Sequence, residues 1–155
     1  GTEEKCEEIF RASYGETAEL MKRRFEMEYI ELAEGIETQI CGISILPKRV
    51  IHMKKGIPYG YRVSWKNRTI GFSGDTEWND NLPELAEETD LFFMECYSGE
   101  KKIPFHTSIS ELKLKSDRLN TKRLLLTHMG DEVRQLAAAG KSPFEIAHDG
   151  QRIEI

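Results

Sequence analysis

The chain has 155 residues, of which 39% are hydrophobic and 32% are charged, with a formal net charge of −5. This length suits a single domain with its own core, and the composition is too apolar for a disordered chain. The acidic balance argues against a nonspecific nucleic-acid binder, and no apolar run approaches the ~20 residues of a membrane span. Cys6, Cys41 and Cys96 form no CxxC pair, which predicts free, mostly buried thiols in a reducing cytoplasm.

The first half of the chain predicts a helix followed by short strands and tight turns. Thr2 is expected to cap a helix that Gly15 interrupts and whose apolar positions are Ile9, Tyr14, Leu20 and Met21. Phe25, Met27 and Tyr29 alternate with polar or acidic neighbours, which predicts a strand that ends near Gly35. Further strands are expected over residues 40–46, 50–53, 59–65 and 69–73, with a polar turn at 66–68.

The second half alternates between strand and helix patterns. Continuous apolar runs at 91–94 and 123–127 predict buried strands. A first helix is expected over 83–88, after a cap at Asn81 or Asp80, and a third over 131–139, before Gly140. Between them, a second helix is expected to begin at a cap at Ser108 or Ser110, and its apolar positions are Ile109, Leu112, Leu114 and Leu119. A last hairpin is expected to join 144–147 to 152–155. The pattern predicts an α/β or α+β layer arrangement.

Potential ligand side chains fall where predicted strands end. His52 and His128 each follow a predicted strand, and Asp75 lies at the end of the strand expected over 69–73. His106 lies in a loop before a helix cap. Strand ends are rigid positions beside open space, and imidazole with carboxylate suits zinc, manganese or iron. A single residue at such a position is more often structural. Glu95 fits either a group that orients a ligand or a rim carboxylate, and His148 is expected to be a turn residue.

Four local sequence motifs, taken together and in this order, resemble those of the metallo-β-lactamase superfamily. They are VIHMKKGIPYGYRV, IGFSGDTEWND, MECYSGEKKIPFHTS and KRLLLTHMG. The resemblance runs from about Thr2 to the end and is greatest to the branch that includes ribonuclease Z. It implies that His52 binds a first metal, that His128 binds a second and that Asp75 bridges them. It also implies a catalytic role for Asp75 and His106, with His106 near the scissile bond as proton donor or charge stabiliser while a metal-bound hydroxide attacks.

The family's main ligand motif, HxHxDH, does not occur in this sequence. The resemblance therefore implies that residues 1–155 form a single incomplete domain, the C-terminal part of an αββα sandwich. Two Zn²⁺ ions are expected in an intact domain, with Mn²⁺ or Fe as alternatives, and this chain alone is expected to be inactive and not to hold a complete dinuclear centre. A missing N-terminal half or self-association would then cover its apolar face.

Two classes of function remain open at this level. The first is a metal-dependent hydrolase of a small-molecule ester or phosphodiester, with RNA possible but less favoured by the acidic chain. The second is a non-catalytic binding or assembly module that keeps half of the fold. Fold alone does not decide between the chemistries that this superfamily hosts.

Overall fold

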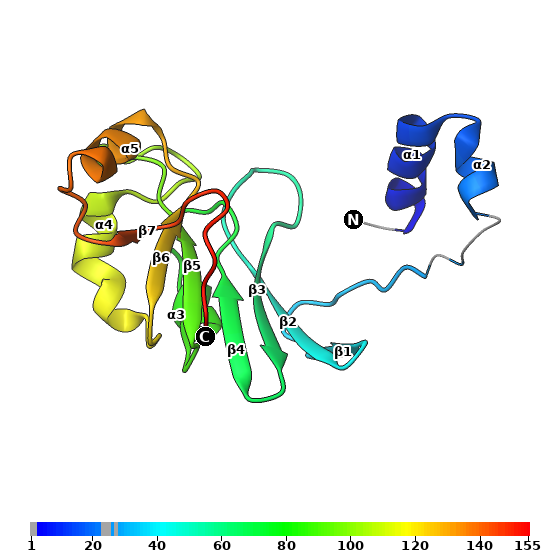
Figure 1. Ribbon diagram of the computed structural model, residues 1–155, viewed down its shortest axis with the longest axis horizontal. Coiled ribbons are helices and arrows are strands. Elements are labelled where there is room, and N and C mark those ends of the chain that lie inside the picture. Colours follow the sequence, from blue (N-terminus) through cyan, green and yellow to red (C-terminus); the bar gives the residue numbers. More distant parts are fainter. Residues whose placement is uncertain (1–2, 23–25, 27) are drawn as a thin grey trace. The chain divides into compact units, whose positions relative to one another are not determined.

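The computed structural model describes residues 3–22, 26 and 28–155. The chain divides into two compact units, Gly1–Ala33 and Glu34–Ile155, and the larger unit contains the sheet (Figure 1). Among the described residues, no helix has the length and apolar character needed to cross a membrane. Cys6 is half-buried, Cys41 is exposed and only Cys96 is buried, so the expectation of mostly buried thiols was wrong.

The smaller unit contains two helices, α1 (Glu3–Tyr14) and α2 (Thr17–Lys22). Gly15 separates them with a φ of +54°, a conformation that glycine adopts at no steric cost, and this confirms the predicted interruption. The expected cap Thr2 and two residues of the expected strand, Phe25 and Met27, lie outside the described residues. Residues 28–35 form no strand, so that prediction was wrong over the part that can be tested.

The larger unit is built on one seven-stranded sheet whose spatial order follows the chain, from β1 to β7. The strands β1 to β4 pair antiparallel, whereas β4 to β7 pair parallel. The bounds are β1 (Thr38–Ile40), β2 (Ile43–Arg49), β3 (Tyr59–Trp65), β4 (Arg68–Phe72), β5 (Leu91–Glu95), β6 (Leu124–Thr127) and β7 (Glu145–Ile146). The mixed sheet with helices confirms the predicted α/β class.

Three predicted strands differ from the structure. The run at 40–46 is a hairpin, because Cys41 and Gly42 both have positive φ and make the tight turn between β1 and β2. The strand expected at 50–53 is absent: β2 ends at Arg49, and Ile51 makes only an isolated bridge to Glu77. The last hairpin was also wrong, because β7 pairs in parallel with β6 while residues 151–155 have no regular structure.

Helices connect the parallel strands, namely α3 (Asn81–Ala86), α4 (Ile109–Lys115) and α5 (Asp131–Ala138). Ser108 caps α4 as predicted, since its hydroxyl accepts the N–H of Glu111 at 3.1 Å. Asp80 precedes α3 without a capping bond from its side chain. Leu114 was expected to face the core, but it is 85% exposed because it lies on the outer side of α4.

The core lies between the three helices and one face of the sheet. It includes Leu82, Leu85 and Ala86 of α3, Phe92 and Met94 of β5, Ile109 and Leu112 of α4, Leu126 of β6 and Val133 of α5. Gly71 of β4 lets α3 approach closely, because a Cβ there would lie 2.7 Å from the carbonyl oxygen of Leu85. This tight packing fixes β4, and with it the loop that follows β4 at the edge of the sheet.

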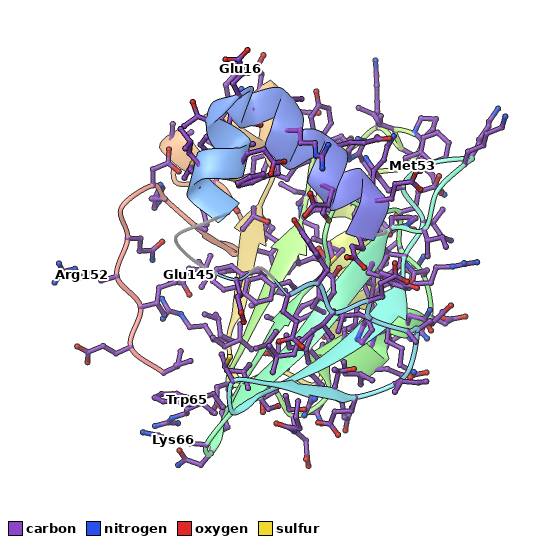
Figure 2. The ribbon with its side chains drawn as sticks, turned by 90° about the vertical axis from the view of Figure 1, so that its right-hand side faces the viewer. Glu16, Met53, Trp65, Lys66, Glu145 and Arg152 are labelled. Atoms are coloured by element: carbon purple, nitrogen blue, oxygen red, sulfur yellow. The ribbon has the colours of Figure 1, made fainter. Side chains whose placement is uncertain are left out.

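The opposite face of the sheet carries an apolar row of registered residues. Phe72 and Phe93 pair across β4 and β5, and their rings stack at 5.0 Å between centroids. Tyr61 of β3 and Leu125 of β6 extend the row on either side. Phe72 is 39% exposed, so part of this row contacts solvent. Figure 2 shows Trp65 and Lys66 at the β3–β4 turn, at the other end of the sheet from Met53.

Candidate metal and acid–base site

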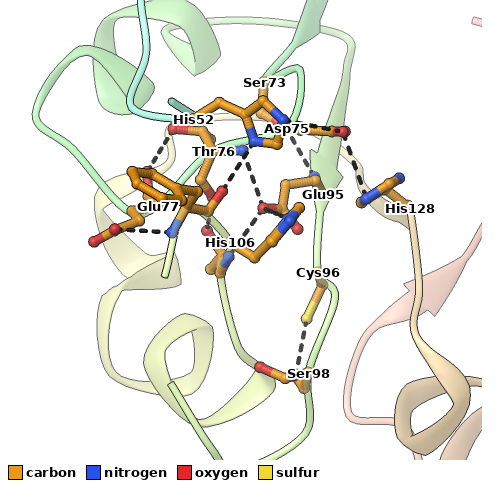
Figure 3. Close-up of polar contacts among 12 residues, drawn as sticks. His52, Ser73, Asp75, Thr76, Glu77, Glu95, Cys96, Ser98, His106 and His128 are labelled. Atoms are coloured by element: carbon orange, nitrogen blue, oxygen red, sulfur yellow. Dashed lines mark hydrogen bonds and ion pairs between the residues drawn. The ribbon is translucent and has the colours of Figure 1, made fainter. Parts of the chain in front are cut away.

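The predicted site residues gather at one edge of the sheet. Because β4, β5 and β6 are parallel, their carboxyl ends lie at the same edge. Asp75 lies three residues beyond the end of β4, Glu95 is the last residue of β5 and His128 follows β6 directly. The loop after β2 brings His52 to the same place, and Figure 3 shows these side chains converging.

Asp75 stands between two histidines. Its Oδ2 atom lies 3.5 Å from Nε2 of His128 and 3.9 Å from Nε2 of His52. All three side chains are partly open to solvent. The structure therefore brings together the three residues expected to be ligands, although the first and the last are 76 positions apart in the sequence.

A network of loop hydrogen bonds holds the ring of His52. Its Nδ1 lies 3.2 Å from the carbonyl oxygen of Phe105, and because a carbonyl oxygen only accepts, Nδ1 carries the hydrogen. With the Nδ1 hydrogen directed at this carbonyl, Nε2 is the ring nitrogen that faces Asp75 and the one positioned to bind a metal. Upstream, the N–H of Ile51 donates to the hydroxyl of Thr76 at 2.9 Å, which ties the His52 loop to the Asp75 loop.

Glu95 is a buried carboxyl group at the centre of this edge, with 1% of its surface exposed. Its Oε1 accepts the backbone N–H groups of Thr76 at 3.0 Å and Thr107 at 2.9 Å. Its Oε2 is buried and has no hydrogen-bond partner among the described residues. Burial raises the pKa of Glu95 to about 7, the charge of Asp75 adds to the rise, and the backbone N–H bonds oppose it.

His106 is held by that carboxyl group. Its Nδ1 lies 3.2 Å from Oε1 of Glu95, so Glu95 is not the rim carboxylate that the sequence left open but a group that orients a neighbour. The ring of His106 lies 5.2 Å from the His52 ring and 5.3 Å from the His128 ring, centroid to centroid. Burial, followed by the charges of His128 and His52, lowers the pKa of His106, which favours the neutral imidazole.

Two non-glycine residues in the site adopt left-handed backbone conformations. His128 has a φ of +48°, and Phe105, just before His106, has a φ of +68°. Such conformations cost free energy and persist where the surroundings hold them. Phe105 is held by an N–H bond to Glu77 at 2.9 Å, in addition to its contact with His52. The strain therefore coincides with the two positions that aim histidines into the site.

The donor set fits a divalent metal in its chemistry, since two imidazoles and a carboxylate are ligands of zinc, manganese and iron. The 3.5 Å between Nε2 of His128 and Oδ2 of Asp75 is also compatible with two atoms that share one ion at about 2.0–2.2 Å from each. Within the described part of the chain, however, no group of three or more His, Cys, Asp or Glu residues is arranged to hold a metal ion. His52, Asp75 and His128 therefore have side chains of the right chemical type, but the described residues do not by themselves form a complete metal site.

The structure separates the remaining candidates. His148 lies in an exposed turn, where its backbone N–H donates to Oε1 of Gln151 at 3.0 Å, as expected of a turn residue. Tyr97 was not singled out from the sequence, yet its ring stacks on His106 with 4.8 Å between centroids. Its position two residues beyond Glu95 was the only signal available, and an aromatic residue there is unremarkable without the fold.

A family model described as the beta-lactamase superfamily domain matches residues 4–129. The uncharacterized protein ML1173 of Mycobacterium leprae is 26% identical over 132 residues, which is 79% of this chain and 46% of that protein. The chain thus spans about half the length of this curated relative.

Solved structures show the same fold. The metallo-beta-lactamase fold protein YhfI of Bacillus subtilis superposes with a TM-score of 0.67 at 19% identity, over 86% of this chain and 58% of that one. A diphosphatase of the PhnP family superposes with a TM-score of 0.64 at 20% identity, over 91% of this chain and 56% of that one. The short form of human tRNase Z superposes with a TM-score of 0.56 at 23% identity, over 76% of this chain and 44% of that one. At these identities the likeness establishes the fold alone.

Replacing Glu95 with Gln should change how stability depends on pH. The raised pKa means that the folded state keeps its proton up to about pH 7, whereas the unfolded chain releases it near 4.5. The stabilising contribution of Glu95 is therefore complete below pH 4.5 and is lost as the pH rises through 7. Urea unfolding between pH 4 and 8 should show wild type losing stability relative to E95Q across this window. The exposed variant D117N serves as control, and a wild-type-to-E95Q difference that is constant with pH would contradict the assignment.

Proposed function

Because the chain belongs to the beta-lactamase superfamily domain family, we propose that it is part of a metal-dependent hydrolase that acts on an ester or phosphodiester. The observation that carries the proposal is the convergence of Asp75 with Nε2 of His52 and of His128, beside a His106 ring held by Glu95. This arrangement pairs candidate metal ligands with a candidate proton donor at one edge of the sheet.

In this proposal His52, Asp75 and His128 are metal ligands, and zinc is the expected metal, with manganese or iron as alternatives. A bound metal would supply Lewis-acid polarisation of the scissile group and a nucleophile at neutral pH. The protein's part is to preset the ligands. The Phe105 carbonyl fixes the tautomer of His52, and the left-handed backbone at His128 sets the direction in which that ring leaves β6.

His106 is proposed to act on the leaving group or on developing negative charge. Glu95 holds Nδ1 of His106, which leaves Nε2 as the atom available to substrate. A buried carboxyl group with a pKa of about 7 can balance charge on the ring as a proton moves, so the pair suits acid–base work near neutral pH. Glu95 is a positioning residue in this scheme, whereas His106 contacts the substrate.

The remaining ligands are proposed to come from another polypeptide segment. The sequence contains no HxHxDH motif, and the described residues complete no metal site by themselves. The chain also spans only 46% of its curated relative and 58% of YhfI. A segment that supplies the missing ligands would complete the shell around Asp75. On this proposal the isolated chain is inactive, and a small-molecule substrate is favoured over RNA because the chain is acidic.

A non-catalytic binding or assembly module is the second candidate. The observation in its favour is that no described group of three or more ligand residues is arranged to hold a metal. The tautomer of His52, the buried Glu95 and the strained His128 have no evident use in such a module. Metal binding separates the two candidates.

Zinc binding should depend on the three proposed ligands. In titration calorimetry of the chain with Zn²⁺, D75N, H52Q and H128Q should each weaken binding by at least about tenfold, because each removes one of few ligands. The variant H148Q removes an exposed histidine outside the site and should bind zinc like wild type. Equal affinities in all five proteins would refute the ligand assignment.

Hydrolysis should depend on His106 in the protein expressed from its full reading frame. With zinc and bis(p-nitrophenyl) phosphate, H106Q should lower the turnover rate by roughly 10²–10⁴-fold, the range of a lost general acid. D75N should remove activity, and H148Q should leave it unchanged. If H106Q turns over substrate as fast as wild type, His106 has no part in the chemistry.

A partner segment should also cover the apolar row around Phe72 and Phe93, because exposed apolar surface favours association. We expect the isolated chain to elute from size-exclusion chromatography above its mass of 17.9 kDa, or to be poorly folded. The single substitution F72S should shift the elution toward the monomer. A stable, well-folded monomer of the wild-type chain would contradict this expectation.

A further inference from the structure

A cavity of about 390 Å³ opens beside the site, on the loops that follow β5 and β6. Its size lies within the range of roughly 300–1,000 Å³ typical of small-molecule sites. The residues that line it are Tyr97, His128, Met129, Gly130, Asp131 and Arg134. His128 belongs both to the cluster of His52, Asp75 and His128 and to the lining of this cavity, so a substrate held at the cluster can extend into the cavity.

The ring of Tyr97 forms a fixed wall of this cavity. Its backbone N–H donates to the carbonyl of Thr107 at 3.0 Å, and its own carbonyl accepts the N–H of Gly130 at 2.9 Å. A Cβ at position 130 would lie 2.4 Å from that carbonyl oxygen, so only glycine allows the approach. The ring packs against the rings of His106 and His128, with 4.8 Å and 5.6 Å between centroids, and Tyr97 as a whole is 38% exposed, which leaves part of the residue open to a ligand. A held, partly open aromatic ring is a ready stacking surface.

Arg134 supplies a cation in the same cavity. Its guanidinium pairs with Asp131 Oδ1 at 2.5 Å, and the two side chains are 63% and 85% exposed. An exposed pair of this kind contributes little to stability, so the guanidinium can turn to an anionic ligand at little cost. Arginine also binds phosphate and carboxylate oxygens in a bidentate manner. The cavity thus offers an aromatic face and an available positive charge.

We propose that this cavity is the subsite for a planar aromatic group of an anionic substrate, which stacks on Tyr97 while Arg134 pairs with its charge. The inference rests on the proposed hydrolase function and narrows the substrate to aryl or nucleoside esters that carry negative charge. Stacking is tolerant of the ring's identity, because every aromatic group has a π-face. Tyr97 is therefore a specificity residue that selects aromatic over aliphatic esters.

Binding of two small probes to the chain, without metal and without turnover, tests the inference. Phenyl phosphate and methyl phosphate carry the same anion, and stacking of about 1–3 kcal/mol predicts that wild type prefers the phenyl compound by roughly 5–150-fold. The variant Y97L should reduce that preference to below about threefold, whereas Y97F should keep it. R134Q should weaken both probes to a similar extent, and R152Q, which changes an exposed arginine near the chain end, should change neither.

The backbone amide signals of Gly130 and Asp131 in ¹H–¹⁵N spectra provide a second measurement that needs no variant. They should shift on addition of phenyl phosphate to wild type and shift less with methyl phosphate. Equal affinity for the two probes, an unchanged preference in Y97L, or no shift at these amides would each overturn the inference. Loss of hydrolysis in wild type with the phenyl preference intact would instead count against the proposed function alone.

Discussion

A single carboxylate oxygen joins the parts of the molecule on which the site depends. Oε1 of Glu95, at the end of a fully paired strand, accepts bonds from the backbone of Thr76 and Thr107 and contacts Nδ1 of His106. One bond fixes the loop that carries Asp75, and the others fix the loop that carries His106. A buried carboxyl group without such bonds would be costly, and these bonds offset part of that cost while they hold the two loops.

The sheet provides the frame for this junction. Gly60 and Gly71 let α3 pack directly on β3 and β4, and the parallel pairing of β4, β5 and β6 places three strand ends in a row. The loops then add what the strands cannot. His52 arrives from the antiparallel side of the sheet, and its ring is turned by a carbonyl of the His106 loop. Rigid strands with bonded loops hold the imidazoles around Asp75 within a few ångströms before any ligand binds.

The site and the neighbouring cavity share His128 and are linked through the Tyr97 ring, which stacks on His106. In the proposed enzyme, a substrate group that contacts Tyr97 would therefore also influence the His106 ring, which Glu95 orients. The strained backbone at Phe105 and His128 adds stiffness at the same place. Because one fold can host many reactions, the proposed function rests on these side chains and not on the sheet.

The sequence by itself determined the residue types and most of the local elements. Apolar runs identified β5 and β6, alternation identified β3, and the strings around His52, Asp75, His106 and His128 identified the family, because these signals lie within short stretches of chain. Tertiary structure decided the rest. Whether Glu95 is buried or at the rim, whether β7 pairs with β6 or with the chain end, and whether Tyr97 lines a cavity all depend on neighbours far away in sequence. Burial, hydrogen-bond partners and pKa are properties of those neighbours, and no local pattern encodes them.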